Sequence, residues 1–235
     1  MPTVGVIKPS TRPGKAEELV AMLPKEIELV HSGINIERGT LQELVRGLYE
    51  YEVRVAEMAE QGVDLIHPAG VPPLLLGYEG ERALVDRWEK QHKRPVFTNG
   101  MSQVNALRAF KARRIVAAGY FPGDINKTFG QYLTEAGFEV LEMVGMEVDF
   151  RVVPRVSAAA IYHFIQALFF RHHAVDAIYL LGPAWRATLD MIEQLESDFG
   201  VPVIHHVPAQ SWEIQRRFGL RQPVQGYGRL MREMP

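Results

Sequence analysis

Short runs of apolar, often β-branched residues alternate along the chain with longer stretches in which apolar residues recur every three or four positions. Residues 40–61 form the clearest long stretch, whose apolar residues share one helical face: Leu41, Leu44, Val45, Leu48, Val55 and Met58. Thr40 is a typical helix N-cap and Gly62 a typical helix end, so a helix is predicted between them.

The same alternation of apolar runs and amphipathic stretches continues along the whole chain. The strands it predicts lie at residues 4–7, 63–67, 95–98, 114–119, 138–143, 175–181 and 202–205. The helices it predicts further on lie around Val104 to Phe110 and at residues 125–136, 156–170, 188–199 and 208–218. Buried strands separated by helices are typical of parallel βαβ units, whose ligands bind beyond the carboxyl ends of the strands.

An internal repeat accompanies this alternation. Residues 63–70 resemble residues 175–182, and each segment is followed by a helix and then by a Pro-Val strand, at Pro95 and Pro202. Two similar βαβ halves predict two parallel-sheet lobes related by pseudo-twofold symmetry, with a cleft between them. We expect an N-terminal lobe over residues 1–112, a C-terminal lobe over residues 113–214, and a tail, 215–235, packing back on the first lobe.

Composition narrows the chemistry. The 235 residues are 47% hydrophobic and 23% charged, with a formal charge of −2, so no basic field favours nucleic acid. The cysteine count is zero, which excludes disulfides, thiolate metal sites and a cysteine nucleophile. No signal-peptide core and no membrane-spanning apolar run is evident, and we expect a cytoplasmic protein without membrane contact.

The chain resembles the aspartate/glutamate racemase superfamily, especially its maleate isomerase and arylmalonate decarboxylase branch. The segments that carry the resemblance are residues 94–110, 113–116, 120–126, 137–140, 176–182, 188–190 and 200–203, with Trp212. The resemblance implies an α/β fold of two flavodoxin-like lobes with the active site between them. It also implies proton transfer beside a carboxylate, or addition to an alkene, carried out by one or two cysteines.

This sequence differs from the family pattern at the positions where the resemblance implies the catalytic cysteines. The resemblance places the two cysteines at about Gly70 and at Pro183, and an expected carboxylate-binding tyrosine is replaced by Phe121, with Tyr120 beside it. Glycine and proline side chains can neither give nor take a proton. The fold therefore transfers to this chain, whereas the cysteine mechanism does not.

Other side chains after the predicted strands could bind a substrate carboxylate. Arg12 offers a bidentate contact, although it also suits a solvated loop. Thr98 and Asn99 could donate to a ligand oxygen or cap the next helix, and Asn126 has a structural role as its alternative. The apolar loop from Val71 to Gly77 is either a hydrophobic wall or a buried structural loop. The substrate-binding candidates are Pro9, Ser10, Thr11, Arg12, Gly70, Val71, Thr98, Asn99, Phe121, Pro183 and Ala184.

Histidines are the natural substitutes for a missing thiolate. His67 ends a repeated strand and is a candidate proton carrier, with a core histidine as its alternative, and Tyr120 is the second catalytic candidate. His205 and His206 end another strand, where adjacency should turn them to opposite faces. No acidic residue has a spacing that would complete a metal site with these histidines.

Two functions follow from these observations. The first is a cysteine-independent enzyme that acts on a small carboxylate or dicarboxylate by decarboxylase-like or isomerase-like chemistry, with no cofactor and no metal. The second is a catalytically silent homologue that binds a small acid or a protein partner. An open cleft lined by His67, Arg12 and Thr98 would favour the enzyme, whereas one plugged by Trp185 and the 72–76 loop would favour the silent homologue. The sequence leaves homo-oligomer formation open.

Overall fold

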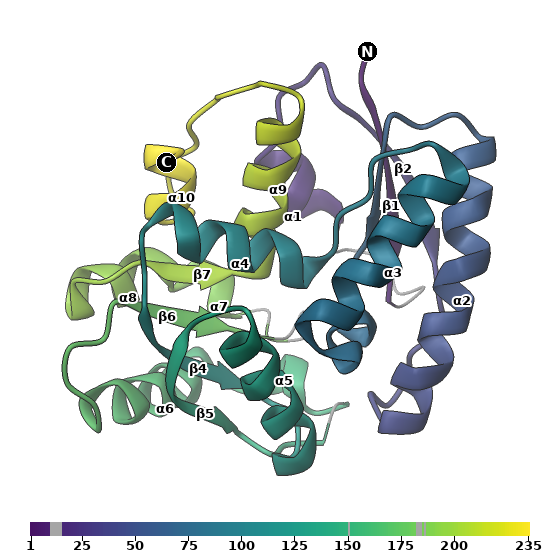
Figure 1. Ribbon diagram of the computed structural model, residues 1–235. Helices are drawn as coiled ribbons and strands as arrows, with labels where there is room; N and C mark the ends of the chain where they lie inside the picture. The colour runs from purple at the N-terminus through teal and green to yellow at the C-terminus, as the bar shows by residue number, and fades with distance from the viewer. Residues whose placement is uncertain (10–15, 150, 182–184, 186) are drawn as a thin grey trace. The chain divides into compact units, whose positions relative to one another are not determined.

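The computed structural model describes residues 1–9, 16–149, 151–181, 185 and 187–235. It divides into two compact units, Met1–Met101 and Ser102–Pro235, each an α/β unit built on one parallel sheet (Figure 1).

The first unit has a three-stranded parallel sheet in the order β2-β1-β3. Its elements are β1 (Thr3–Lys8), α1 (Ala16–Ala21), β2 (Glu28–Gly33), α2 (Leu41–Glu60), β3 (Leu65–Pro68), the 3-10 helix η1 (Pro72–Leu76) and α3 (Gly77–His92). α4 (Asn99–Ala109) runs from this unit into the second. The strand expected at residues 95–98 is reduced to one parallel bridge between Val96 and Ile66. It is short because Pro95 has no N–H to donate and Thr98 already caps α4.

The second unit has a four-stranded parallel sheet in the order β5-β4-β6-β7. Its strands are β4 (Arg114–Gly119), β5 (Glu139–Gly145), β6 (Ala177–Leu180) and β7 (Val203–His205). Its helices are α5 (Gly123–Glu135), the 3-10 helix η2 (Val153–Arg155), α6 (Ala158–Phe170), α7 (Ala187–Asp190), α8 (Ile192–Phe199), α9 (His206–Arg217) and α10 (Arg229–Glu233). The helix predicted at 188–199 is broken, because Met191 has φ −100° and ψ 0°, outside helical geometry.

The two sheets repeat one plan, which confirms the flavodoxin-like α/β fold. In both sheets the first strand in chain order lies between the second and the third. The Val96 bridge to β3 corresponds to the fourth strand, β7, of the second sheet. The repeat includes single hydrogen bonds. A carboxylate oxygen of Glu89 accepts from the N–H of Val96 at 2.7 Å, and Glu196 accepts from the N–H of Val203 at 3.0 Å.

Helix α2 shows how the sequence builds the first unit. Thr40 caps it by accepting from the N–H of Glu43 at 3.3 Å, as predicted. Leu44, Val55 and Met58 are buried, and α2 and α3 lie beside the sheet (Figure 1). The single apolar face expected for this helix is wrong in one respect. Leu41 and Val45 are exposed, because they point away from the residues that pack on the sheet.

The C-terminal residues make their contacts inside the second unit. The N–H of Gly226 donates to Glu193 at 3.0 Å, the N–H of Arg229 donates to Glu196 at 2.7 Å, and α10 packs on α9. The two compact units divide between Met101 and Ser102, within α4. The lobe boundary at residue 112 and the packing of the tail, residues 215–235, on the N-terminal lobe stay predictions from the sequence.

Candidate functional site

Several of the predicted site residues lie in the loops at the carboxyl ends of the strands, next to the point where the strand order of each sheet reverses. In sheets of this order the loops after the first and third strands diverge, and ligands bind there. Pro9 follows β1, and Gly70 and Val71 follow β3, while Tyr120 and Phe121 follow β4. The other candidates in these loops, Ser10, Thr11, Arg12, Pro183 and Ala184, lie outside the described residues.

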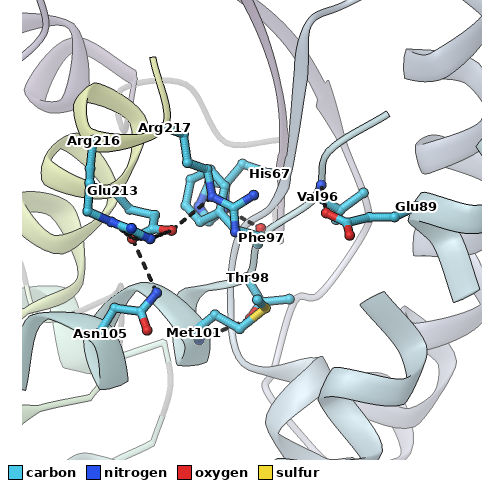
Figure 2. Close-up of polar contacts among 10 residues, drawn as sticks. All are labelled: His67, Glu89, Val96, Phe97, Thr98, Met101, Asn105, Glu213, Arg216 and Arg217. Carbon is cyan, nitrogen blue, oxygen red and sulfur yellow. Dashed lines mark hydrogen bonds and ion pairs between the residues drawn. The ribbon is translucent and has the colours of Figure 1, made fainter. Parts of the chain in front are cut away.

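His67 lies on β3 and is wholly buried. Its Nδ1 is 2.9 Å from the carbonyl oxygen of Phe97, and its ring stacks on the Phe97 ring with centroids 4.2 Å apart at 11° (Figure 2). A carbonyl oxygen can only accept, so the proton of the neutral ring is on Nδ1 and the lone pair is on Nε2. The structure therefore holds His67 in a tautomer suited to receiving a proton at Nε2.

Gly70 adopts a backbone conformation that only glycine tolerates, with φ +114°. A Cβ at this position would lie 3.0 Å from the Cβ of Pro9 and 3.0 Å from the hydroxyl oxygen of Tyr51. The Tyr51 hydroxyl donates to the carbonyl oxygen of Ala69, and burial raises the pKa of Tyr51 far above its usual range. The position where the resemblance implies a cysteine is thus shaped for a residue without a side chain.

Thr98 and Asn99 stand at the start of α4, and both are buried. The hydroxyl oxygen of Thr98 accepts from the N–H of Met101 at 3.2 Å, which is the capping role foreseen for it (Figure 2). A hydroxyl that accepts in this way keeps its hydrogen to donate. Val71 is also buried and accepts from the N–H of Leu74 at 3.0 Å, so the apolar loop has a structural role as the start of η1.

An aromatic group surrounds the end of β4. Tyr120 stacks on Phe121 with centroids 4.5 Å apart, and the edge of Trp185 meets Tyr120 at 5.9 Å. Phe164 also packs against Trp185, with centroids 6.1 Å apart, and all of these rings except Phe164 are buried. Trp185 makes this end of the second sheet apolar, and its indole N–H has no hydrogen-bond partner among the residues that the structure describes.

Asn126 has the structural role that was its alternative. Its side-chain amide donates to the carbonyl oxygen of Phe121, and this pair lies against Gly145. A Cβ on Gly145 would overlap both atoms, so glycine is required for this close approach. Asn126 therefore fixes the turn that carries Tyr120 and Phe121.

His205 is a structural histidine. Its Nδ1 accepts from the N–H of Val207 at 3.2 Å, and its Nε2 is 3.0 Å from the hydroxyl of Thr188. That hydroxyl donates to the carbonyl oxygen of Trp185 at 2.5 Å, so Nε2 carries the proton and donates to Thr188. Complete burial lowers the pKa of His205 to about 3. The ring is therefore neutral and pins the backbone at Trp185.

The expectation that His205 and His206 face opposite sides of a strand is wrong. Their rings lie 4.2 Å apart, because the strand ends at His205 and α9 begins at His206. Within the described ranges no three His, Asp or Glu side chains gather into a group that could hold a metal ion. No helix in the described part of the chain is long and apolar enough to cross a membrane.

Two buried polar side chains, Tyr51 and Glu213, were not among the candidates predicted from the sequence. Tyr51 falls on the buried face of α2, where a tyrosine needs a partner for its hydroxyl, and this was the available signal. Glu213 is wholly buried on α9 and accepts from Arg216 and Arg217 at 2.8 Å and from Asn105 at 3.3 Å (Figure 2). The spacing of three and four residues from Glu213 to the arginines indicates such pairs on a helix.

Comparison with known proteins places this geometry in a family. The sequence model described as arylmalonate decarboxylase matches residues 4–231. The chain belongs to the arylmalonate decarboxylase family. It is 27% identical to arylmalonate decarboxylase from Bordetella bronchiseptica over 241 residues, covering 99% of this chain and 97% of that protein. It is 24% identical to maleate isomerase from Pseudomonas putida over 242 residues, covering 97% and 96%.

Solved structures of the arylmalonate decarboxylase family share the fold. A liganded double mutant of arylmalonate decarboxylase superposes with a TM-score of 0.89 at 23% identity, covering 99% of this chain and all of that one. At this identity the similarity establishes the architecture. The resemblance inferred from the sequence is thereby confirmed, and this family member has no cysteine anywhere in its chain.

Proposed function

We propose that this protein is an enzyme that binds a small carboxylate or dicarboxylate and moves a proton at the carbon next to the carboxylate, without a cysteine. Membership of the arylmalonate decarboxylase family supports a carboxylate substrate. The similarity to proteins named arylmalonate decarboxylase and maleate isomerase supports decarboxylase-like or isomerase-like chemistry. A cytoplasmic location stays a prediction from the sequence.

The observation that carries the proposal is the tautomer of His67. The Phe97 carbonyl 2.9 Å from Nδ1 fixes the proton there, so Nε2 is the basic atom. The stacked Phe97 ring fixes the plane of the imidazole as well. Both nitrogens of His205 serve hydrogen bonds, which cap α9 and hold Thr188. His67 is therefore our choice of proton carrier.

In a decarboxylation, the bond between the central carbon and one carboxylate breaks, that carboxylate leaves as CO2, and the electron pair of the broken bond remains as an enediolate on the retained carboxylate. Protonated His67 then gives its Nε2 proton to that carbon, and solvent returns a proton to Nε2. In an isomerase-like reaction at a saturated carbon next to a carboxylate, neutral His67 would remove the proton to leave an enediolate and then return it. Tyr120 is the alternative donor, because a phenol can give a proton and its ring is held by Phe121 and Trp185.

Binding of the retained carboxylate is assigned to the loops that follow the strands. The Thr98 hydroxyl and the first turn of α4 offer donors, since helix N-termini favour anions. Arg12, with Ser10 and Thr11, is proposed as the charged partner. We propose Pro9, Gly70, Val71, Asn99, Phe121, Pro183 and Ala184 as further substrate-contacting residues.

The test is deuterium incorporation at the α-carbon of maleate, aspartate and aryl-malonates, followed by NMR in deuterated water. His67→Asn is the informative variant, because its amide can still donate to the Phe97 carbonyl but cannot act as an acid or a base near neutral pH. We expect it to lose at least about a hundredfold in rate, whereas His205→Asn should retain activity. Tyr120→Phe keeps the aromatic packing and asks whether the phenol is needed.

If wild-type protein exchanges no deuterium with any of these acids and none of them shifts its melting temperature, the proposed function is wrong. A melting shift without exchange would identify the silent homologue. Full activity in His67→Asn together with loss in Tyr120→Phe would move the proton-carrying role to Tyr120.

A further inference from the structure

Two buried polar atoms at the carboxyl end of the second sheet have no hydrogen-bond partner among the residues that the structure describes. One is the indole N–H of Trp185, which is a donor, and the other is the side-chain carbonyl oxygen Oδ1 of Asn126, which is an acceptor. The two residues are 1% and 3% exposed, respectively. Buried polar groups in proteins are nearly always hydrogen-bonded, and each exception calls for an explanation. A ligand group that pairs with both atoms supplies one.

The donor and the acceptor belong to neighbouring strand ends, because β4 and β6 are paired. A Cβ built on Gly119, the last residue of β4, would lie 3.4 Å from Oδ1 of Asn126 and 3.2 Å from the carbonyl oxygen of Leu181, which follows β6. Tyr120 comes next in the chain, and its ring meets the edge of Trp185 with centroids 5.9 Å apart. Asn126 and Trp185 thus approach two consecutive residues at a strand end, where parallel sheets bind ligands.

Both groups are held in place by other hydrogen bonds. The backbone carbonyl of Trp185 accepts from the hydroxyl of Thr188 at 2.5 Å, and Thr188 is held in turn by His205 at 3.0 Å. The side-chain amide of Asn126 donates to the carbonyl oxygen of Phe121, so its Oδ1 is the atom left to accept. A donor and an acceptor that are ordered before a ligand arrives lower the entropy cost of binding it.

We propose that Trp185 and Asn126 recognise a hydroxyl group on the substrate, so that the acid bound by this protein is a hydroxy acid. A hydroxyl oxygen accepts from the indole N–H, and the hydroxyl hydrogen is donated to Oδ1 of Asn126. A carboxylate satisfies only the donor, and an ammonium group satisfies only the acceptor. The assignment rests on the proposed function, because it names the substrate class of the same site.

Affinities of the full chain for acids that differ by one hydroxyl test the assignment. The probes are malonate against hydroxymalonate, and phenylmalonate against 4-hydroxyphenylmalonate. We expect the hydroxylated acid of at least one pair to bind at least about tenfold more tightly, because the acid without the hydroxyl leaves both buried atoms unpaired. Fluorine in place of that hydroxyl should abolish the gain, since it has no hydrogen to donate to Asn126.

Trp185→Phe keeps an aromatic ring but removes the indole N–H. This variant should lose the preference for the hydroxylated acid and still bind the acid that lacks the hydroxyl. Trp212→Phe is the matched control, because it removes another buried tryptophan, on α9, and should keep the preference. Melting curves of both variants would verify their folding.

The indole N–H signals in an NMR spectrum give a readout that does not depend on catalysis. The chain has three tryptophans, and Trp185→Phe assigns the Trp185 signal by its absence. Saturation of the wild type with the hydroxylated acid should move this proton signal downfield, as formation of a hydrogen bond does. The Trp88 signal should not move, because its indole N–H already donates to Glu52 at 2.7 Å.

Equal affinities within both pairs of acids would overturn the assignment, and so would a preference that Trp185→Phe retains. A Trp185 signal that does not move at saturation would overturn it as well. In each of these cases, deuterium exchange by the wild type would leave the proposed function standing. A moved Trp185 signal without any exchange would instead support the hydroxy-acid site and reject the catalytic role.

Discussion

The hydroxyl of Tyr51 donates a hydrogen bond to the carbonyl oxygen of Ala69, one residue before Gly70. This contact ties α2 to the loop that follows β3 and brings the phenolic oxygen to within 3.0 Å of where a Cβ on Gly70 would lie. The hydrogen bond that holds the loop therefore also places the Tyr51 hydroxyl where it would crowd a side chain at Gly70. The first cysteine position implied by the family resemblance is occupied by a glycine that its surroundings require.

Gly70→Ala is expected to destabilise the protein through both its backbone and its new methyl group. The positive φ alone costs about 1 to 3 kcal/mol, and the close contacts with Pro9 and Tyr51 add to it. Gly137→Ala is the matched control, because Gly137 has φ +96° and no atom within 4 Å of the added Cβ. Urea denaturation should show the larger loss for Gly70→Ala. Equal losses of unfolding free energy in the two variants would mean that the contact with Tyr51 adds no cost to Gly70→Ala.

Tyr51→Phe should cost about 1 to 2 kcal/mol of unfolding free energy, because it leaves a buried carbonyl without this donor. Tyr49→Phe, two residues earlier on the same helix, changes an exposed hydroxyl and should stay within about 0.5 kcal/mol of wild type. The comparison is made by chemical denaturation at one protein concentration. A difference between the variants that lies within error would contradict the role given to the Tyr51 hydroxyl.

His205 should make the protein sensitive to acid. Its pKa is about 3 when folded, and an unfolded histidine titrates near 6.5, so between these values only the unfolded chain binds the proton. Unfolding free energy should therefore be unaffected above about pH 6.5 and fall by about 1.4 kcal/mol per pH unit below it. At pH 5 the loss from this residue is about 2 kcal/mol.

The variant that isolates this effect is His205→Asn, which can still cap α9 but does not titrate. Its stability should depend less steeply on pH between pH 5 and pH 7 than that of the wild type. His163→Gln, on the exposed surface of α6, is the control for removing a histidine. Parallel slopes for His205→Asn and the wild type would show that folding does not lower the pKa of His205.

Glu89 and Glu196 should have equivalent roles in their two sheets. Glu89 accepts from the N–H of Val96, at the bridge that ends the first sheet, and Glu196 accepts from the N–H of Val203, at the start of β7. Glu89→Ala and Glu196→Ala should each cost about 1 to 3 kcal/mol, and the glutamine variants less, because they keep an acceptor oxygen. The Glu196 variant should lose more, since this carboxylate also accepts from the N–H of Arg229. Glu79→Ala, an exposed change on α3, is the control. If both alanine variants match it in denaturation, the two hydrogen bonds add no stability.

Much of the fold could be read from local patterns. The helix at 40–61, the strand at 114–119 and the repeat of residues 63–70 at 175–182 all rest on short-range periodicity, and each has its counterpart in the structure. Strand β2 was missed because its residues Glu28–Gly33 are mostly half-exposed and lack alternation. It is a strand because it pairs with β1, a contact distant in sequence.

The candidate site shows the same limit. The sequence placed His67, Thr98 and Tyr120 at strand ends, where a parallel sheet binds ligands. It could not tell which ring nitrogen of His67 or His205 carries the hydrogen. That depends on Phe97, which lies 30 residues from His67, and on Thr188, which lies 17 residues from His205.

The sequence by itself determined the two α/β repeats, the lack of any thiol and the short set of polar residues at the strand ends, because periodicity and composition are local properties. Only the tertiary structure decided that a side chain at Gly70 would crowd Pro9 and Tyr51, that His205 is a capping residue and that Leu41 and Val45 are exposed. Those properties depend on which atoms surround a residue. Chain folding sets these neighbours through contacts between residues far apart in the sequence.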